Sequence, residues 1–332
     1  MRFLVFVGKV AIAMVLALGL ADLALRAFWP NDLRLDENFS APLLTRIIAR
    51  DDLQKRIVFL GDSALWGYGL DAQDAVPSLL AARGFPVENL SYEGGSIANT
   101  YALLRILLAH GVRPRMIVFN VNLKEFSPGD SAYRTLYPAV EQLAWPDLTP
   151  PERQRLDRKA KTTLDARFDR RIGSVWMLYG MRSDIREKIF GAADASTALD
   201  DRIHALSGEA QREARAHVPT ADRFLGTYDL APLDNENVEV FFLRRLCELV
   251  KIANLRAVAI LTPTNHTLLH EYIDSPDYAA QLAYVTEMME NAGLTVLDDD
   301  RRFAAKDFLD NDHLTADGNV LWATQLAREL TR

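Results

Sequence analysis

The sequence predicts an α/β protein with a mostly parallel sheet covered by helices on both faces. Two observations predict this fold class. Short apolar runs typical of buried strands alternate with longer helical patterns, and they recur at the spacing of strand–helix–strand units. A chain of 332 residues, 49% of them hydrophobic, can bury one large core or two small ones. The formal charge of -7 argues against a nucleic-acid binder, which would carry a basic excess.

Each expected strand is a short run of apolar, largely aliphatic residues, bounded by polar residues, glycine or proline. They are residues 56–60, 87–90, 116–122, 257–263 and 294–298. The expected helices lie between them and show longer, interrupted apolar patterns. They are residues 75–83, 98–110, 236–253 and 277–292, followed by a C-terminal helix after residue 313.

The N-terminus differs in kind from the rest of the chain. Residues 3–28 are apolar apart from Lys9, Asp22 and Arg26. Because a lysine can extend its ammonium group toward the lipid headgroups, the run approaches the roughly 20 residues that a bilayer requires. Residues 1–30 are therefore predicted to be a transmembrane anchor.

Positive charges predict how this anchor is oriented. Arg2 and Lys9 precede the apolar centre, which favours a cytoplasmic N-terminus and an exported remainder. Residues 31–332 are thus expected to be one domain on the periplasmic side of the cytoplasmic membrane. A cleaved signal peptide with small residues at 19–21, or a buried helix of a soluble protein, is the alternative.

The strand–helix alternation stops between about 130 and 230, and this region is predicted to be a helical insertion. Thr149 followed by two prolines is typical of a helix start, and apolar residues then recur every fourth position over 156–172. Residues 152–188 carry eleven Lys/Arg and six Asp/Glu. Such a run is ordinarily a solvated face, and contact with anionic headgroups or a partner is the alternative.

A serine stands where the first core strand ends, in the stretch IVFLGDSALWGYGL. Chemistry in parallel sheets gathers at the carboxyl ends of the strands, and Ser63 follows such an end directly. A serine becomes a nucleophile when an oriented histidine takes its proton. His313, in FLDNDHLTADGN, follows Asp310 by three residues, so the Asp310 carboxylate can accept the imidazole N–H. Asp62 is expected to hold the turn by hydrogen bonds.

Other chemistries leave no comparable signature. The sequence contains no metal-ligand cluster, Walker loop or dinucleotide fingerprint, and Gly67-x-Gly69 lacks the spacing of the last. We therefore expect neither a metal nor a cofactor. The single cysteine, Cys247, lies in an apolar helical stretch, where a cysteine is typically a small core residue.

The serine block and the Asp-x-x-His quartet, with a glycine and an asparagine after the intervening strands, resemble the SGNH (GDSL-like) hydrolase superfamily. The resemblance covers residues 55–125 and 235–330. It implies a flavodoxin-like three-layer α/β/α fold with a parallel sheet. It also implies a catalytic triad in which Ser63 is the nucleophile, His313 the general base and Asp310 its orienting carboxylate.

The resemblance further implies an oxyanion hole. In NLSYEGGS the family's glycine falls on Gly94, with Gly95 as a possible substitute. In IVFNVNL its asparagine falls on Asn122; Asn120 competes because the family's Gly-x-Asn-Asp block is not reproduced. The N–H groups of Ser63 and Gly94 and the Asn122 amide would then converge on the oxyanion. One such donor is worth on the order of 10²–10³ in rate.

Anchored, exported SGNH-like proteins with a helical insertion resemble the accessory proteins of alginate O-acetylation and of teichoic-acid D-alanylation. This resemblance implies transfer of an acyl group, acetyl-like, to an envelope glycan beside a membrane-bound O-acyltransferase. The expected partners are therefore an acyl donor or acylated glycan, that acyltransferase and the membrane, but no nucleic acid. The alternatives are an esterase that removes acyl groups from a glycan or lipid, and a non-catalytic scaffold that binds polymer.

Overall fold

The computed structural model describes residues 13–14, 16–24, 35, 39, 41–127, 136–159, 224 and 227–331, with the side chains of 157–159 excepted. The strands are β1 (Ile57–Leu60), β2 (Val87–Asn89), β3 (Met116–Val121), β4 (Ala257–Leu261) and β5 (Thr295–Asp298). The helices of the α/β core are α3 (Ser63–Trp66), α4 (Val76–Ala82), α5 (Ile97–Ala109), α12 (Val238–Ile252), α13 (His266–Ile273), α14 (Pro276–Asn291) and α15 (Ala316–Leu330).

The five strands form one parallel sheet in the order β2-β1-β3-β4-β5. Because β1 lies between β2 and β3, the chain first winds toward one edge and then crosses back toward the other. This is the flavodoxin-like strand order, in which sites form where the winding reverses. The parallel sheet and its three-layer arrangement confirm the predicted fold class.

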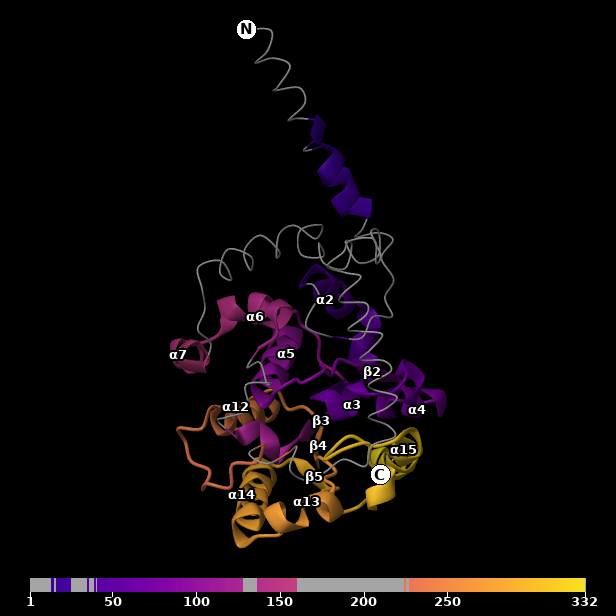
Figure 1. Ribbon diagram of the computed structural model, residues 1–332. Helices are drawn as coiled ribbons and strands as arrows, with labels where there is room; N and C mark the ends of the chain where they lie inside the picture. The colour runs from indigo at the N-terminus through magenta and orange to yellow at the C-terminus, as the bar shows by residue number, and fades with distance from the viewer. Residues whose placement is uncertain are drawn as a thin grey trace, which may run out of the picture.

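Side-chain alternation along the strands divides the core in two. Val58 and Leu60 point into a large apolar cluster with α5, α12 and α14, whereas Ile57 and Phe59 point into a second cluster with α4 and α15. All four side chains of β1 are buried, as expected for a strand covered on both faces. Figure 1 shows α4 and α15 on one side of the sheet and α5, α12 and α14 on the other.

Three helices were not predicted from the sequence. They are α2 (Ala41–Ile48), α13 and the one-turn helix α3. Helix α6 (Pro138–Ala144) lies inside the predicted helical insertion, although its bounds were not predicted. Pro138 begins α6 at its first turn, and the helix packs on α5 and α2, where it buries Val140 completely. Such helices are short, and their periodicity is too brief to separate from a loop by pattern alone.

The predicted insertion is described only at its edges. Helix α7 (Pro150–Lys159) begins as predicted after Thr149, and its buried Glu152 joins the insertion to the core. The Glu152 carboxylate accepts hydrogen bonds from Tyr101 at 2.6 Å and Arg245 at 3.0 Å, on α5 and α12. Residues 160–223 lie outside the described residues, and with them most of the basic run and of the apolar stripe.

Part of the predicted anchor is described. Residues 13–14 and 16–24 are helical, and four of their apolar side chains are more than half exposed: Met14, Leu16, Leu20 and Leu23. In the described part of the chain, no helix combines the length and apolar character needed to cross a membrane. Residues 1–12 and 25–34 lie outside it, so the anchor and the boundary at residue 30 stay predictions.

Candidate functional site

Ser63 is positioned by a sharp change of direction at the end of β1. Gly61 has φ +148°, and a Cβ built on it would lie 1.9 Å from the Asn120 Oδ1 atom, so no side chain fits there. Asp62 then caps α3, accepting the N–H of Ala64 at 2.8 Å. Ser63 is therefore the first residue of α3, with its hydroxyl at the carboxyl edge of the sheet and only 5% exposed.

His313 lies in a loop that folds back on itself before α15. The Leu309 N–H donates to the His313 carbonyl at 2.7 Å, and the Asp310 carboxylate accepts the N–H groups of Asp312 and His313 at 3.1 and 2.9 Å. Asn265, just beyond β4, donates to the Asp310 carbonyl at 3.0 Å. The loop is thus held from within and by the neighbouring strand end, and Asn265 supports the site without contacting Ser63.

The structure brings Ser63, His313 and Asp310 together in one hydrogen-bonded chain. The Ser63 Oγ atom lies 2.8 Å from His313 Nε2, across 250 residues of sequence. On the other side of the ring, His313 Nδ1 lies 2.8 and 3.0 Å from the two Asp310 oxygens. Since an ionised carboxylate only accepts, the ring hydrogen belongs on Nδ1, and Nε2 is left to accept the serine proton.

His313 and Asp310, the two ionisable groups that are hydrogen-bonded to one another here, have shifted pKa values. Burial lowers the pKa of His313, but the carboxylates of Asp312 and Asp310 outweigh it, and the pKa is raised above its ordinary value of 6.5. Burial raises the pKa of Asp310, but His313 and the backbone N–H groups outweigh burial, and the pKa falls below its ordinary value of 3.8. Asp310 is therefore ionised at neutral pH.

The raised His313 pKa gives a test of the triad that the sequence predicts. If His313 is the base that accepts the Ser63 proton, it does so only while it is neutral, and the rate falls as the pH drops through the raised pKa. We expect the acidic limb of kcat/KM for a soluble acetyl ester to have its midpoint above pH 6.5, the ordinary histidine value. A midpoint at or below that value would contradict the geometry of the two carboxylates around the ring.

Gly94 and Gly95 occupy a turn that packs against Gly61. The Tyr92 N–H donates to the Gly61 carbonyl at 2.9 Å, and the Gly95 N–H donates to the Tyr92 carbonyl at 3.1 Å. Within the described residues, the N–H groups of Gly94 and Ser63 have no acceptor. Of the two glycines, Gly94 is thus the one whose N–H remains available for a ligand oxygen.

Asn122 and Asn120 are both engaged beneath the site. Asn122 Nδ2 donates to Asp312 Oδ2 at 2.5 Å and to Asp62 Oδ2 at 3.3 Å. Asn120 Nδ2 donates to Asp62 Oδ1 at 2.7 Å and to Thr262 at 2.9 Å, and its Oδ1 accepts the Asp62 N–H. Because both amides already donate to protein oxygens, an oxyanion role for Asn122 stays a prediction that requires one of these bonds to be exchanged. Asp62 holds the turn, as predicted.

An aromatic side chain that the sequence analysis did not single out covers the imidazole. The Tyr68 ring lies 4.6 Å from the His313 ring, centroid to centroid, at an interplanar angle of 37°. Tyr68 is 38% exposed, whereas His313 is 8% exposed. Tyr68 therefore shields one face of the base from water and presents its own surface to solvent. Its position between Gly67 and Gly69 carries no recognisable motif.

Buried charges behind the imidazole were also missed. Lys124, Glu125 and Asp312 are all buried, and the Lys124 ammonium contacts Asp312 Oδ2. Burial first, and then the charge of Asp62, raises the pKa of Glu125 well above its ordinary value. Two charged residues, Lys124 and Glu125, within four positions of the end of the apolar strand 116–121 are the signal that could have drawn attention to this group.

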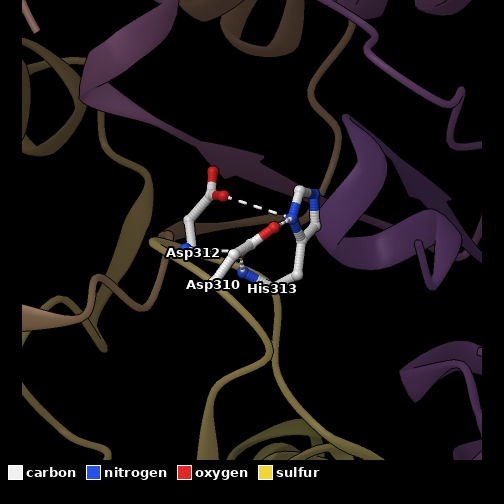
Figure 2. A group of neighbouring side chains, drawn as sticks. All are labelled: Asp310, Asp312 and His313. Atoms are coloured by element: carbon white, nitrogen blue, oxygen red, sulfur yellow. Dashed lines mark hydrogen bonds and ion pairs between the residues drawn. The ribbon is translucent and has the colours of Figure 1, made fainter. Parts of the chain in front are cut away.

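Asp310, Asp312 and His313 place three donor atoms within 4.8 Å of one another (Figure 2). Such a set could hold a divalent cation by its composition. Here, however, the Lys124 ammonium already contacts Asp312, and Asp310 accepts the hydrogen of His313 Nδ1. The donors are therefore arranged for proton transfer, and we assign no metal to them.

No protein-family model matches the chain, and no curated protein matches its sequence. Among solved structures, one similar fold is described as a lipolytic protein of the G-D-S-L family from Desulfitobacterium hafniense DCB-2. It has a TM-score of 0.40 and 8% identity, over 82% of this chain and 98% of that one. Another is an active-site mutant of a family two carbohydrate esterase from Clostridium thermocellum. It has a TM-score of 0.36 and 10% identity, over 85% of this chain and 64% of that one. Both TM-scores are low, so the function below depends on the geometry of the site.

Proposed function

We propose that the chain is an SGNH-like enzyme that uses Ser63 as a nucleophile on O-acyl esters. The observation that carries the proposal is the hydrogen-bonded chain from Ser63 Oγ through both nitrogens of His313 to Asp310, at 2.8 Å on each side of the ring. A serine, a neutral imidazole and an ionised carboxylate in this order are the parts that acyl transfer through a covalent intermediate requires.

The proposed reaction has two halves that share His313. In the first, Ser63 Oγ attacks the acyl carbon while its proton passes to His313 Nε2, and Asp310 stabilises the imidazolium. The N–H groups of Ser63 and Gly94 are the proposed donors to the oxyanion. The tetrahedral intermediate collapses, His313 returns the proton to the departing alcohol, and the acyl group remains on Ser63. In the second half, an acceptor O–H loses its proton to His313 and attacks the acyl carbon. The bond to Ser63 Oγ then breaks while His313 returns the proton to that oxygen.

The acceptor distinguishes a transferase from an esterase. We propose a hydroxyl of an extracytoplasmic envelope glycan as the acceptor, with a membrane-bound O-acyltransferase supplying the acyl group. The apolar N-terminal run and the basic excess over 152–188 support this, because a tether raises the local concentration near a membrane-delivered donor. A degradative esterase would need neither feature. Hydrolysis with water as the acceptor is the second candidate.

One incubation tests both halves. The full chain is mixed with an aryl acetate and de-acetylated envelope oligosaccharides, and the protein and the sugars are analysed separately by mass spectrometry. We expect an acetyl group on the peptide that contains Ser63 and acetylated oligosaccharide in excess over free acetate, since a bound acceptor outcompetes water by proximity. Acetate alone would favour the esterase, and no acetyl on Ser63 would contradict the nucleophile.

The proposed anchor makes a separate prediction about location. Exposed Leu16, Leu20 and Leu23 on the described helix support insertion of this segment into lipid. We expect the chain to sediment with membranes and its large domain to be digested when protease is added to spheroplasts. Protection of residues 31–332 in intact spheroplasts, with digestion after lysis, would reverse the proposed topology.

A further inference from the structure

Asp312 is a second carboxylate on the same ring nitrogen of His313. Its Oδ1 atom lies 3.3 Å from Nδ1, while Asp310 lies at 2.8 Å. Figure 2 shows both carboxylates turned toward one edge of the imidazole. The Asp312 side chain is fully buried, and within the described residues its Oδ1 has no hydrogen-bond partner. The single hydrogen of Nδ1 is taken by Asp310, so Asp312 acts on the ring through its charge and without a hydrogen bond of its own.

The other oxygen of Asp312 is held by two groups from the end of β3. The Asn122 amide donates to Oδ2 at 2.5 Å, and the Lys124 ammonium contacts the same atom. Burying a carboxylate costs free energy unless it is paired with a counter-charge. The ammonium of Lys124, itself buried, supplies that counter-charge to Asp312. The carboxylate opposite His313 is therefore paired with a cation from the end of β3.

We propose that Asp312 is a positioning residue of the Ser63 reaction, a second carboxylate that stabilises the imidazolium, and that Lys124 limits how much of that charge the ring experiences. This inference depends on the proposed function, in which His313 gains and loses a proton in each half-reaction. Asp310 sets the tautomer and the ring orientation. Asp312 acts on the ring only through the electric field of its charge, and it partly supports the reaction when Asp310 is replaced.

The electric field of Asp312 acts on His313 together with the other polar and charged groups around the ring. These groups are Asp310 in the same loop, Ser63 on α3, Tyr68 after α3, and Lys124 on η3 (Leu123–Phe126). Asp62 and Glu125 lie behind Lys124. Lys124 opposes protonation of His313, whereas Asp312 and Asp310 favour it. Removing Asp312 or Lys124 should thus move the His313 titration in opposite directions.

The experiment measures that titration in the full chain, by NMR of the imidazole and by the acidic limb of kcat/KM for an aryl acetate. We expect Asp312→Asn to move both downward by about one pH unit, which corresponds to about tenfold in stabilisation of the imidazolium. We expect kcat to fall with KM unchanged. Lys124→Met should move both upward, and Lys124→Arg should restore the wild-type profile.

A matched control and a double variant complete the test. Asp299→Asn removes an equally buried carboxylate, which accepts a hydrogen bond from Trp322 and does not contact the site. The His313 titration of this variant should therefore match that of the wild type. Adding Asp312→Asn to Asp310→Asn should cost about a further tenfold in kcat. If Lys124→Met fails to fold, Lys124→Met with Asp312→Asn removes both members of the buried pair. The His313 titration should then lie above that of Asp312→Asn alone, because the Lys124 charge that opposes protonation of His313 is gone.

Two results would overturn the inference. One is an Asp312→Asn profile that keeps its midpoint while kcat drops uniformly, because that is what a structural role produces. The other is a shift of the same sign in Asp312→Asn and Lys124→Met. The NMR titration does not require turnover, so it tests Asp312 even if no ester is a substrate. Failure of the proposed function would appear separately, as ester turnover that survives loss of Ser63.

Discussion

Replacing Ser63 with alanine is expected to lower kcat for an aryl acetate by on the order of 10⁴- to 10⁶-fold, because no other group can form the acyl-enzyme. The change removes one nearly buried hydroxyl and its hydrogen bond to His313. The thermal midpoint should therefore change by no more than the loss of about 1 kcal/mol would cause. Steady-state hydrolysis gives the change in kcat, and thermal unfolding of the same preparation gives the change in the thermal midpoint.

The matched control is Ser78→Ala, a half-buried serine on α4 in the same half of the fold. It should keep the wild-type turnover. Alanine at position 63 with undiminished turnover would mean that another nucleophile or a contaminating esterase is responsible. A complete loss in both variants would indicate damage to the fold and no specific role for Ser63.

Changing Asp310 to asparagine is expected to lower kcat by on the order of 10²- to 10⁴-fold with little change in KM. An amide in place of the carboxylate presents N–H groups to His313 Nδ1 and favours the wrong tautomer. The amide oxygen can still accept the backbone N–H groups of Asp312 and His313 that the carboxylate now accepts, so the loop should keep its shape. Asp312, 3.3 Å from the same nitrogen, is the reason to expect the smaller part of this range.

The comparison variant is Asp317→Asn, an exposed carboxylate in the first turn of α15 that does not contact His313. Its kcat should equal that of the wild type. A kcat for Asp310→Asn within about threefold of wild type would mean that Asp310 does not orient the base. A large rise in KM at constant kcat would instead assign Asp310 to substrate binding.

The sheet could be predicted from the sequence because its signals are local. Each strand lies within the predicted range, and for β1 the structure gives Ile57–Leu60 where the sequence predicted 56–60. A buried parallel strand needs an unbroken apolar run, and a turn needs glycine or a capping residue, as at Gly61 and Asp62. These requirements can be read without knowing which strand lies beside which.

The pairing of Asp310 with His313 was predictable for the same reason. The two residues lie three positions apart, and a turn that caps itself on Asp310 brings the carboxylate to the ring. Ser63 is 250 residues away, and its meeting with His313 was inferred from a rule of parallel sheets together with the family resemblance. The structure brings these three side chains together at hydrogen-bond distances.

Tertiary structure alone decided the rest of the site. Asp312 directly precedes His313, a spacing that does not by itself indicate contact with the ring, but the folded-back loop turns both carboxylates to Nδ1. Lys124 arrives from a strand end almost two hundred residues earlier in the chain, and its contact with Asp312 has no sequence signature. Charges that face one another across a core depend on how distant segments pack, since no local pattern encodes the distance between them. The sequence by itself determined which residues are the candidates for the chemistry, and packing decided which charges surround them.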